Sequence, residues 1–592
     1  MNTRLKRRLT WTVGGVLLCA VAVGAYIFTH MSQTLPTLAL AINYVRYLGA
    51  PDGTITTEIN RTAPAAEAPS PAAATPAVLE DDWPHYNKTL TSNRFSPLAQ
   101  INSGNVGKLK VLCTYDTGAH TAFSTGLIEV NGALIGTTGY DIFSIDPATC
   151  TENWRTHENY VPAAPMLANR GAAYMDGRLF RGTQDARVLA YDFKTGKRLW
   201  ATRIGNPNMG ESAPAAPIAW DGLVYIGQAG GDSKGVKGRM YALDARTGKI
   251  VWEFYLVPKT AGDLVRGPQG DSPLNTSTWQ TPHGQPITGG ATWTSYTLDP
   301  ATGLLYVPGG NPAPDFVPDM RKGENLYSGS IVILDAKTGA YRDHIKVVPL
   351  DWHDWDVSSA PSLIQTARGR KIISLAPKDG HLYGFDMATK AMLYRTPVTR
   401  IENAEEQFST SRSVHFCPGS GGGAEWNGPA YDPSTNFVYI GEVDWCNTVK
   451  VQTSKQLVNA PMGAPWGGMA TINPFDVWGA QDTFHKWAGW VYAIDADTGA
   501  WRWRVKTNYP IQSGMTPTAG GVIFFGNAGG YFYVLDAITG EKLWGQKIGG
   551  AIGGGVITYS VNGTQKVAVA HGLTSILWPT PIATAKVSIL GL

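Results

Sequence analysis

The chain has 592 residues, which is long enough for several average domains or for one large all-β array. Its 49 basic and 46 acidic residues nearly balance and form no basic stripe interleaved with aromatic side chains, which argues against nucleic acid as a partner. Only 16% of the residues are charged, whereas Gly (68) and Trp (20) are abundant, and this composition indicates many tight turns and an aromatic-rich core instead of a helical bundle.

The N-terminus carries four basic residues, Arg4, Lys6, Arg7 and Arg8, followed by an uncharged stretch over 9–28. Twenty uncharged, mostly apolar residues match the length of a membrane-spanning helix. The basic residues before it would stay in the cytoplasm and place the rest of the chain in the periplasm. We therefore expect a single-pass inner-membrane protein. A cleaved signal peptide is the alternative, although its apolar region would be shorter.

Five segments are expected along the chain. Residues 1–8 form a basic cytoplasmic segment, 9–28 the transmembrane anchor and 29–60 a juxtamembrane segment. Residues 61–78 are rich in Ala and Pro, which cannot build a core, and are typical of an extended tether. The folded domain is expected over 80–592.

One sequence motif recurs in this domain: a predicted strand that ends in Asp, a Thr-Gly turn, and a second strand that ends in Trp or Tyr. "YALDARTGKIVW", which ends at Trp252, is one of four strong copies, which end at residues 200, 252, 503 and 544. The first two lie 52 residues apart and the last two 41 residues apart. The Asp can cap the turn, and Thr-Gly supplies the hydroxyl group and the positive φ that a tight hairpin needs. Strong and weak copies place this Asp at positions 146, 192, 244, 335, 386, 495 and 536.

A four-stranded repeat of roughly 40–50 residues is typical of a propeller blade. The recurring Trp is expected to pack between adjacent blades. The length of the domain at this period predicts an all-β propeller of seven or eight blades.

Other segments depart from the repeat. "PLDWHDWDVSS" concentrates three Asp, one His and two Trp in residues 351–356, and a metal site, a catalytic acid or base, or an ordinary turn would each fit it. Together with "NRFSPLAQINSGNVGKLKVLCTYDTG", "YVPGGNPAPD", "LAPKDGHLYGFD" and "GGGAEWNGPAYDP", it resembles, in order, the opening and active-site segments of the quinoprotein alcohol dehydrogenases. The resemblance covers roughly residues 83 to 580. It implies an eight-bladed β-propeller that uses pyrroloquinoline quinone (PQQ).

The resemblance also implies roles for individual residues. Asp356 corresponds to the catalytic carboxylate, which must be ionised and aimed to accept a proton from an alcohol. Lys378 corresponds to a cation near the reactive carbonyl, where it stabilises developing negative charge. Trp293 corresponds to the flat floor under the quinone, and Arg170 to an arginine that contacts it. Further cofactor contacts are expected from Asp232, Ser233, Lys378, Glu425, Trp426 and Asn427.

Each of these residues also has a purely structural interpretation. Asp356 could cap a turn, Trp293 could be one more core Trp, and Lys378 could be a solvated surface residue. Asp351, His353 and Asp354, beside Asp356, are expected to shape the loop or to lie at its rim.

The expected metal ligands are Asn311, Asp356 and Asp232. An amide oxygen and carboxylates suit a hard cation that prefers oxygen, and we expect calcium. The third ligand in the family is usually a Glu, but Ser233 stands at that position, so Asp232 is expected to substitute for it. Ser358 stands two residues after the catalytic Asp, where lanthanide-dependent relatives carry another Asp, and this disfavours a lanthanide.

Cysteine usage adds further expectations. Cys417 and Cys446 match the family's spacing for a structural disulfide, which leaves Cys113 and Cys150 as a second pair. Residues 164–165 are Ala-Pro, where many relatives have two adjacent, bonded Cys residues over the quinone. No Cys-x-x-Cys-His motif occurs, so electrons are expected to pass to a separate cytochrome c or to membrane quinone.

The expected function is that of a membrane-anchored periplasmic dehydrogenase that oxidises the hydroxyl group of an alcohol or a sugar with PQQ and calcium. The alternative is a non-catalytic propeller scaffold of the envelope, of the outer-membrane assembly type, which has the blades without the site. The match of Asp356, Lys378, Trp293 and Arg170 favours the enzyme, whereas Ser233 counts against it.

Overall fold

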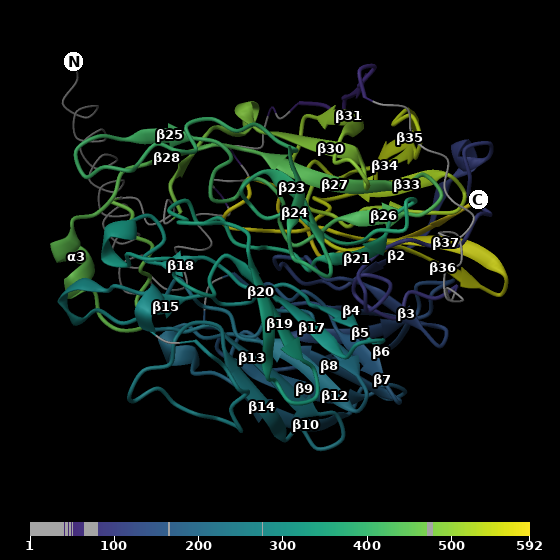
Figure 1. Cartoon of the computed structure of the whole chain (residues 1–592). Coiled ribbons are helices and arrows are strands. Elements are labelled where there is room, and N and C mark those ends of the chain that lie inside the picture. Colours follow the sequence, from purple (N-terminus) through teal and green to yellow (C-terminus); the bar gives the residue numbers. More distant parts are fainter. Residues whose placement is uncertain are drawn as a thin grey trace, which may run out of the picture.

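The computed structural model describes residues 41, 45, 49, 51–63, 81–163, 166–274, 276–470 and 478–592. Almost all of its regular structure is antiparallel β-sheet (Figure 1). Among these residues no helix is long and apolar enough to cross a membrane. This finding contradicts the single-pass inner-membrane location predicted above, and the segment 9–28 on which that prediction rested lies outside the described residues.

Three four-stranded sheets form the first part of the domain. The first has β3 (Ile128–Val130), β4 (Ala133–Thr137), β5 (Asp141–Ile145) and β6 (Glu152–His157). The second has β7 (Ala173–Met175), β8 (Arg178–Gly182), β9 (Arg187–Asp192) and β10 (Arg198–Arg203). The third has β11 (Ile218–Trp220), β12 (Leu223–Gly227), β13 (Arg239–Asp244) and β14 (Ile250–Tyr255).

Three more sheets follow in the middle of the chain. The fourth has β16 (Thr297–Asp299), β17 (Leu304–Pro308), β19 (Ser330–Asp335) and β20 (Tyr341–Lys346). The fifth has β21 (Ser362–Gln365), β22 (Lys371–Leu375), β23 (His381–Asp386) and β24 (Met392–Pro397). The sixth has β26 (Ala430–Asp432), β27 (Phe437–Asp444), β30 (Ala488–Asp495) and β31 (Trp501–Thr507), and β1 (Ile55–Ile59) adds a fifth strand to it.

The last two sheets close the structure. The seventh has β32 (Thr516–Pro517), β33 (Val522–Gly526), β34 (Tyr531–Asp536) and β35 (Lys542–Lys547). The eighth combines β36 (Val556–Val561), β37 (Thr564–His571) and β38 (Lys586–Gly591) with β2 (Lys110–Asp116) from the beginning of the domain. Successive four-stranded antiparallel sheets, closed by an early and a late strand, form a β-propeller.

Smaller elements lie between the sheets. β15 (Thr288–Gly289) pairs with β18 (Pro312–Ala313), and β28 (Asn447–Val449) pairs with β25 (Val414–Phe416) and β29 (Ala480–Gln481). A short helix, α3 (Ser454–Asn459), lies near these strands at the left of the molecule (Figure 1).

The recurring turns have the geometry that their residues predict. Asp192 Oδ1 accepts hydrogen bonds from the Thr195 N–H at 2.9 Å and from the Thr195 hydroxyl group at 2.8 Å. Gly196 has φ +68°, and a Cβ added there would lie 2.4 Å from the ring of Trp154 in the preceding sheet. Trp154 Nε1 also donates to the Phe193 carbonyl at 3.0 Å. The Trp at the end of one sheet therefore packs on the Thr-Gly turn of the next.

The same contact recurs around the propeller. It joins Trp200 to Gly248, Trp252 to Gly339 and Trp503 to Gly540, where an added Cβ would lie 2.6 Å from the indole ring in each case. The prediction that the recurring Trp packs between blades is confirmed.

Both expected disulfides are present, Cys113–Cys150 and Cys417–Cys446. Cys113 lies in β2, and Cys150 follows β5 in the first sheet. The first bond therefore links the closing strand of the last sheet to the first sheet.

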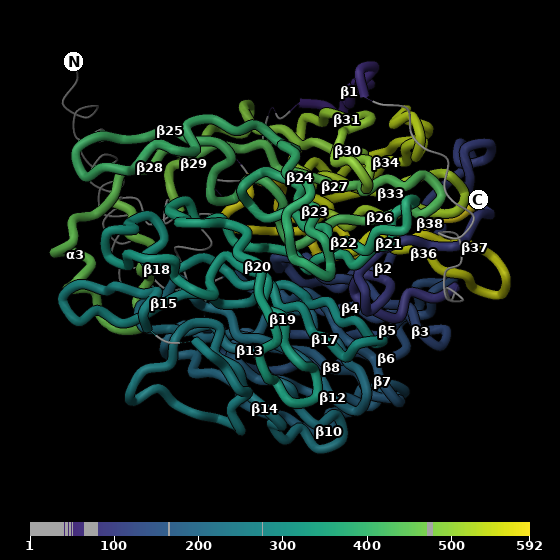
Figure 2. The backbone as a smooth tube through the Cα atoms, in the orientation of Figure 1, coloured from purple at the N-terminus to yellow at the C-terminus, as the bar shows by residue number. Residues whose placement is uncertain are grey.

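β1 is an element that the sequence did not predict. It lies in the segment 29–60, which was expected outside the folded domain, yet it runs beside β31 (Figure 2). Ile55 pairs with Thr507 and Ile59 with Trp503. Arg504 holds this strand through the Glu58 carboxylate at 2.6 Å.

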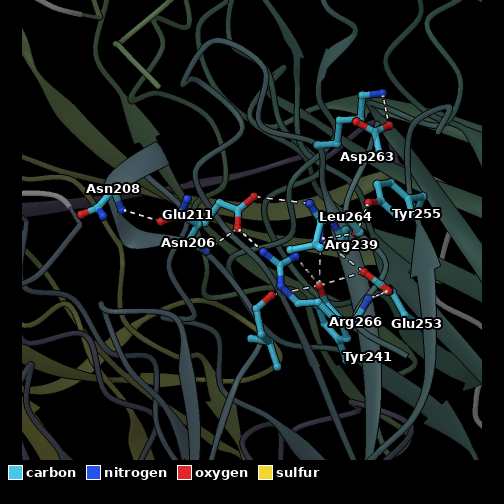
Figure 3. A network of polar contacts seen from close by, with 12 residues as sticks. Asn206, Asn208, Glu211, Arg239, Tyr241, Glu253, Tyr255, Asp263, Leu264 and Arg266 are labelled. Carbon is cyan, nitrogen blue, oxygen red and sulfur yellow. Dashed lines mark hydrogen bonds and ion pairs between the residues drawn. The ribbon is translucent and has the colours of Figure 1, made fainter. Parts of the chain in front are cut away.

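A network of polar contacts holds the long segment between β14 and β15 (Figure 3). Arg239 contacts Glu211 at 3.4 Å and Glu253 at 3.3 Å, and Arg266 contacts Glu211 at 3.1 Å. Two arginines compensate two carboxylates, so the segment is held without an unpaired buried charge.

Candidate active site

The predicted site residues lie on loops between strands of several sheets. Arg170 precedes β7, and Asp232 lies between β12 and β13. Trp293 precedes β16, and Asn311 lies between β17 and β18. Four further residues follow the same pattern: Asp356 between β20 and β21, Lys378 between β22 and β23, and Glu425 and Trp426 between β25 and β26.

Asp356 and Lys378 form a buried ion pair. Asp356 Oδ2 lies 2.7 Å from Lys378 Nζ, and Oδ1 accepts the Asn311 backbone N–H at 2.8 Å. A Cβ at Gly310 would lie 2.7 Å from Oδ1, so the chain reaches this carboxylate closely only because residue 310 is glycine. Both oxygens of Asp356 are thus oriented by donors.

Lys378 is held as a cation. Burial lowers the pKa of its ammonium group, but Asp354, Asp356 and Glu425 outweigh burial and raise that pKa well above its ordinary value. A second contact joins Lys378 Nζ to Asp354 at 3.4 Å. The ammonium group also lies 5.5 Å from the centre of the Trp293 ring.

Two cations border the indole of Trp293. The Arg170 guanidinium lies 5.2 Å from the Trp293 ring centre and 3.7 Å from that of Trp426. Trp293 is partly exposed, whereas Arg170 and Trp426 are buried. Burial lowers the pKa of Arg170 to about 10, with Tyr86 and Glu425 acting in the opposite direction. The arrangement is a flat apolar surface with positive charge beside it.

Several buried polar atoms at this surface have no hydrogen-bond partner among the described residues. They include Arg170 Nε and Asn427 Oδ1, although Asn427 Nδ2 donates to the Gly441 carbonyl at 2.8 Å. An orphaned donor and acceptor beside a flat ring fit a planar, anionic, hydrogen-bonding ligand. The residues present therefore fit a bound PQQ.

An acidic group adjoins the ion pair. One carboxylate oxygen from each of Asp232, Asp315 and Asp354 lies within 4.8 Å of the other two. Burial and the neighbouring carboxylates raise the pKa of Asp315 and of Asp354 well above the ordinary value. The pKa of Asp232 is raised to about 6 by burial and by Asp356, while Lys378 acts in the opposite direction. Oxygen donors gathered in this way fit a hard cation.

The side chains of Ser233 and Asp232, which are adjacent in sequence, have different surroundings. A Cβ at Gly210 would lie 2.4 Å from Ser233 Oγ, so this hydroxyl faces Gly210, and Ser233 forms a β-bridge with Pro465. Asp232, by contrast, lies in the acidic group. Glu425 is buried next to Lys378 and Arg170, and burial raises its pKa to about 7 against the effect of both cations.

The residues before Asp356 divide into two kinds. Asp351 accepts the backbone N–H groups of His353 at 2.9 Å and Trp355 at 3.1 Å, and His353 stacks on Trp355 with ring centres 3.8 Å apart. These two residues shape the loop, as predicted. Asp354 was expected to do the same, but it contacts Lys378 and belongs to the acidic group.

Asp315 was not predicted to belong to the site. It is the last residue of the segment "YVPGGNPAPD", which resembles an active-site segment of the family. A carboxylate after Pro in an otherwise apolar stretch was the available signal.

Known proteins are similar to this chain in sequence and fold. The family described as the glucose/ethanol/alcohol dehydrogenase β-propeller domain matches residues 83–405, and that of outer membrane protein assembly factor BamB matches 488–573. The "alcohol dehydrogenase (quinone), dehydrogenase subunit" of Gluconobacter oxydans is 30% identical, with 83% of this chain and 70% of the relative covered. The "lanthanide-dependent methanol dehydrogenase" of Methylacidiphilum fumariolicum is 28% identical, with 83% and 84% covered.

Solved structures agree with these relatives. A europium-containing methanol dehydrogenase has a TM-score of 0.75 at 25% identity, with 86% of this chain and 98% of that chain covered. The quinohemoprotein alcohol dehydrogenase of Comamonas testosteroni also has a TM-score of 0.75 at 25% identity, with 86% and 80% covered.

Proposed function

The chain belongs to the PQQ-dependent quinoprotein alcohol dehydrogenase family, and from this premise we propose that it oxidises the hydroxyl group of a small alcohol and passes the electrons to a separate acceptor. The observation that carries the proposal is the buried Asp356–Lys378 pair beside the partly exposed Trp293 ring. A general base and a fixed cation next to a flat binding surface are what alcohol oxidation by a quinone requires.

Trp293, Arg170 and Lys378 would hold the cofactor. The indole of Trp293 offers the surface on which a planar tricyclic quinone stacks. Arg170 and Lys378 would pair with its carboxylates and carbonyl oxygens, and Glu425, Trp426 and Asn427 would line its rim. When bound, PQQ supplies the quinone carbonyl that accepts a hydride equivalent.

Asp356 would accept the proton of the substrate hydroxyl group. The Asn311 N–H and the Lys378 ammonium group orient its two oxygens, which fixes the carboxylate before substrate arrives. Preorganisation of this kind avoids a reorganisation cost during the reaction. Lys378 would in addition stabilise negative charge that develops on an oxygen beside it.

Calcium is the cation that we propose, with Asn311, Asp356 and Asp232 as ligands. Ser358, the position that carries an extra Asp in lanthanide-dependent relatives, donates its hydroxyl group to the Ala424 carbonyl at 2.7 Å. The Ser358 hydroxyl group therefore already has a hydrogen-bond partner within the protein. Ser233 faces away and is not among the proposed ligands.

The eight large sheets are proposed to be the eight blades of one propeller, with the site on loops from several of them. Cytochrome c or a quinone is the proposed acceptor, because the sequence has no Cys-x-x-Cys-His motif for a haem of its own. An alcohol is preferred over a sugar as substrate, since the relatives named above are alcohol dehydrogenases.

A non-catalytic scaffold remains the competing function, and the BamB family matches residues 488–573. Those residues contain the repeat but none of the predicted site residues. A scaffold has no use for several buried carboxylates around one ammonium group, because burying such charges is costly unless they serve a ligand.

The test is reconstitution of the purified full chain with PQQ and calcium, followed by dye-linked assays over primary alcohols, secondary alcohols and aldose sugars. We expect turnover that requires PQQ and an alcohol. Binding of PQQ without turnover on any substrate would favour the scaffold.

A further inference from the structure

We propose that Asp315 is a ligand of the metal site and, with Asp232 and Asp354, replaces the carboxylate that the family usually supplies at the position of Ser233. This inference rests on the proposed function, because it concerns the cation of the same site. It assigns a metal-binding role to two residues, Asp315 and Asp354, that the resemblance leaves without one.

Asp315 is buried and unpartnered. Only 1% of its surface is exposed, and neither of its carboxylate oxygens has a hydrogen-bond partner among the described residues. A buried acceptor without a donor destabilises a protein, and a buried carboxylate does so more strongly. Such a group persists where a ligand satisfies it. The oxygens that could share this ligand are those of Asp232 and Asp354, within 4.8 Å.

Asp356, which is also a predicted metal ligand, is less free to bind a cation. Asp356 directs one oxygen at the Asn311 N–H and the other at Lys378 Nζ, at 2.8 Å and 2.7 Å. Each oxygen therefore already faces a donor. Neither oxygen of Asp315 faces such a donor among the described residues, which makes Asp315 the stronger candidate for a direct bond to a cation.

One loop positions two of these carboxylates. The Trp466 N–H donates to the Asp232 carbonyl at 2.7 Å, and the next residue, Gly467, accepts the Phe316 N–H at 2.9 Å. A Cβ at Gly467 would lie 3.0 Å from Asp315 Oδ2, so the loop packs closely over this carboxylate.

The loop is itself anchored by a buried lysine. Lys234 Nζ donates to the carbonyl groups of Val458 and Ala460, both at 2.8 Å, at the end of α3. Arg321 donates to the backbone carbonyls of Asp315 at 2.8 Å and Asp351 at 2.7 Å. The position of Asp315 is therefore built from several independent contacts.

The charge balance points to a multivalent cation. Four carboxylates, those of Asp232, Asp315, Asp354 and Asp356, face the Lys378 ammonium group and the Arg321 guanidinium. Asp351 also lies near Arg321, so the carboxyl groups outnumber these two cations, and ionised carboxylates here leave uncompensated negative charges. Ca²⁺ and a trivalent lanthanide share the oxygen-ligand chemistry that would compensate them.

The experiment measures metal binding and not turnover. CaCl₂ and TbCl₃ are titrated in parallel into the full chain, with and without PQQ, by calorimetry and by terbium luminescence excited through the Trp residues. The variants are Asp315→Asn and, as a matched control on the same loop, Asp319→Asn, whose side chain is 84% exposed. We expect Asp315→Asn to weaken binding at least tenfold and Asp319→Asn to leave it unchanged.

Thermal melting supplies a second readout. Without metal, Asp315→Asn removes an unpaired buried carboxylate and should melt at a higher temperature than the wild type, whereas the increase on adding metal should be smaller. Equal affinity of the wild type and Asp315→Asn, or no binding of either cation by the wild type, would overturn the inference. If PQQ binds and alcohol is oxidised while Asp315→Asn keeps its affinity, only this inference fails. The cation that the wild type binds more tightly distinguishes calcium from a lanthanide.

Discussion

Replacing Asp356 with Asn removes the proposed base and nearly preserves its shape. The amide oxygen can still accept the Asn311 N–H, whereas the ion pair with Lys378 at 2.7 Å is lost. General-base catalysis contributes about 10²–10⁴-fold, which corresponds to roughly 3–5 kcal/mol of activation free energy. We expect kcat to fall by at least that factor in a dye-linked alcohol assay with PQQ and calcium both saturating.

The same change should also affect stability. Breaking a buried ion pair costs about 3–5 kcal/mol when a charge is left alone. Lys378 keeps Asp354 at 3.4 Å, so a loss of about 1–3 kcal/mol in the free energy of unfolding is expected. Asp351→Asn is the control, because it loosens the loop without touching the pair and should leave kcat within about tenfold of the wild type. Near-normal kcat in Asp356→Asn, with cofactor and metal bound, would refute the assignment of Asp356 as the base.

Three further predictions concern the stability of the fold. Burial raises the pKa of Glu129 to about 8, so the folded protein keeps a proton that the unfolded chain loses above the ordinary value of 4.5, and stability falls as the pH rises between these values. By urea unfolding, Glu129→Gln should therefore be more stable than the wild type by roughly 2–4 kcal/mol at pH 8.5 and equally stable near pH 4. A difference in unfolding free energy that does not change with pH would contradict this. Replacing Cys113 and Cys150 by Ser should cost about 3–4 kcal/mol through the 37-residue separation that the bond closes, and an unchanged urea midpoint would count against the link. Trp252→Ala should lower the free energy of unfolding by about 3–5 kcal/mol. Gly339→Ala should destabilise the Trp252→Ala variant less than the wild type, because in the wild type the added Cβ would lie 2.6 Å from the Trp252 ring. Strictly additive effects of the two substitutions on the melting temperature would exclude the contact.

Blade geometry could be predicted because its causes are local. Asp192 and Thr195 meet within one turn, and the Gly that follows needs the positive φ that Trp154 then covers. The spacing of this repeated motif along the chain predicts units of four strands, and loops inserted between the strands do not change that prediction.

Elements that depend on distant contacts could not be predicted in the same way. β1 is a partly exposed strand whose partner, β31, lies more than 400 residues later, and nothing in "ITTEI" specifies that pairing. Ser233 and Asp232 are adjacent in sequence, and only the folded loop determines which of them faces the site. The inner-membrane location was inferred from the apolar stretch 9–28 and the basic residues before it, and it is contradicted by the absence of a membrane-spanning helix among the described residues.

The acidic group shows why a site is harder to predict than a fold. Asp232, Asp315 and Asp354 come from three separate loops, and each is unremarkable within its own segment. Their role emerges only when the propeller brings them within 4.8 Å of one another.

PQQ binding on the surface of Trp293 between Arg170 and Lys378 is tested most directly by a calorimetric titration. PQQ is titrated into the purified full chain with saturating calcium, and into Trp293→Ala under the same conditions. We predict one site per chain in the wild type and an affinity at least tenfold lower in Trp293→Ala. The melting temperature should change little, because this indole is only partly buried and lies at the edge of a hydrophobic cluster. No heat of binding in the wild type, or equal affinity in Trp293→Ala, would contradict PQQ binding at this surface.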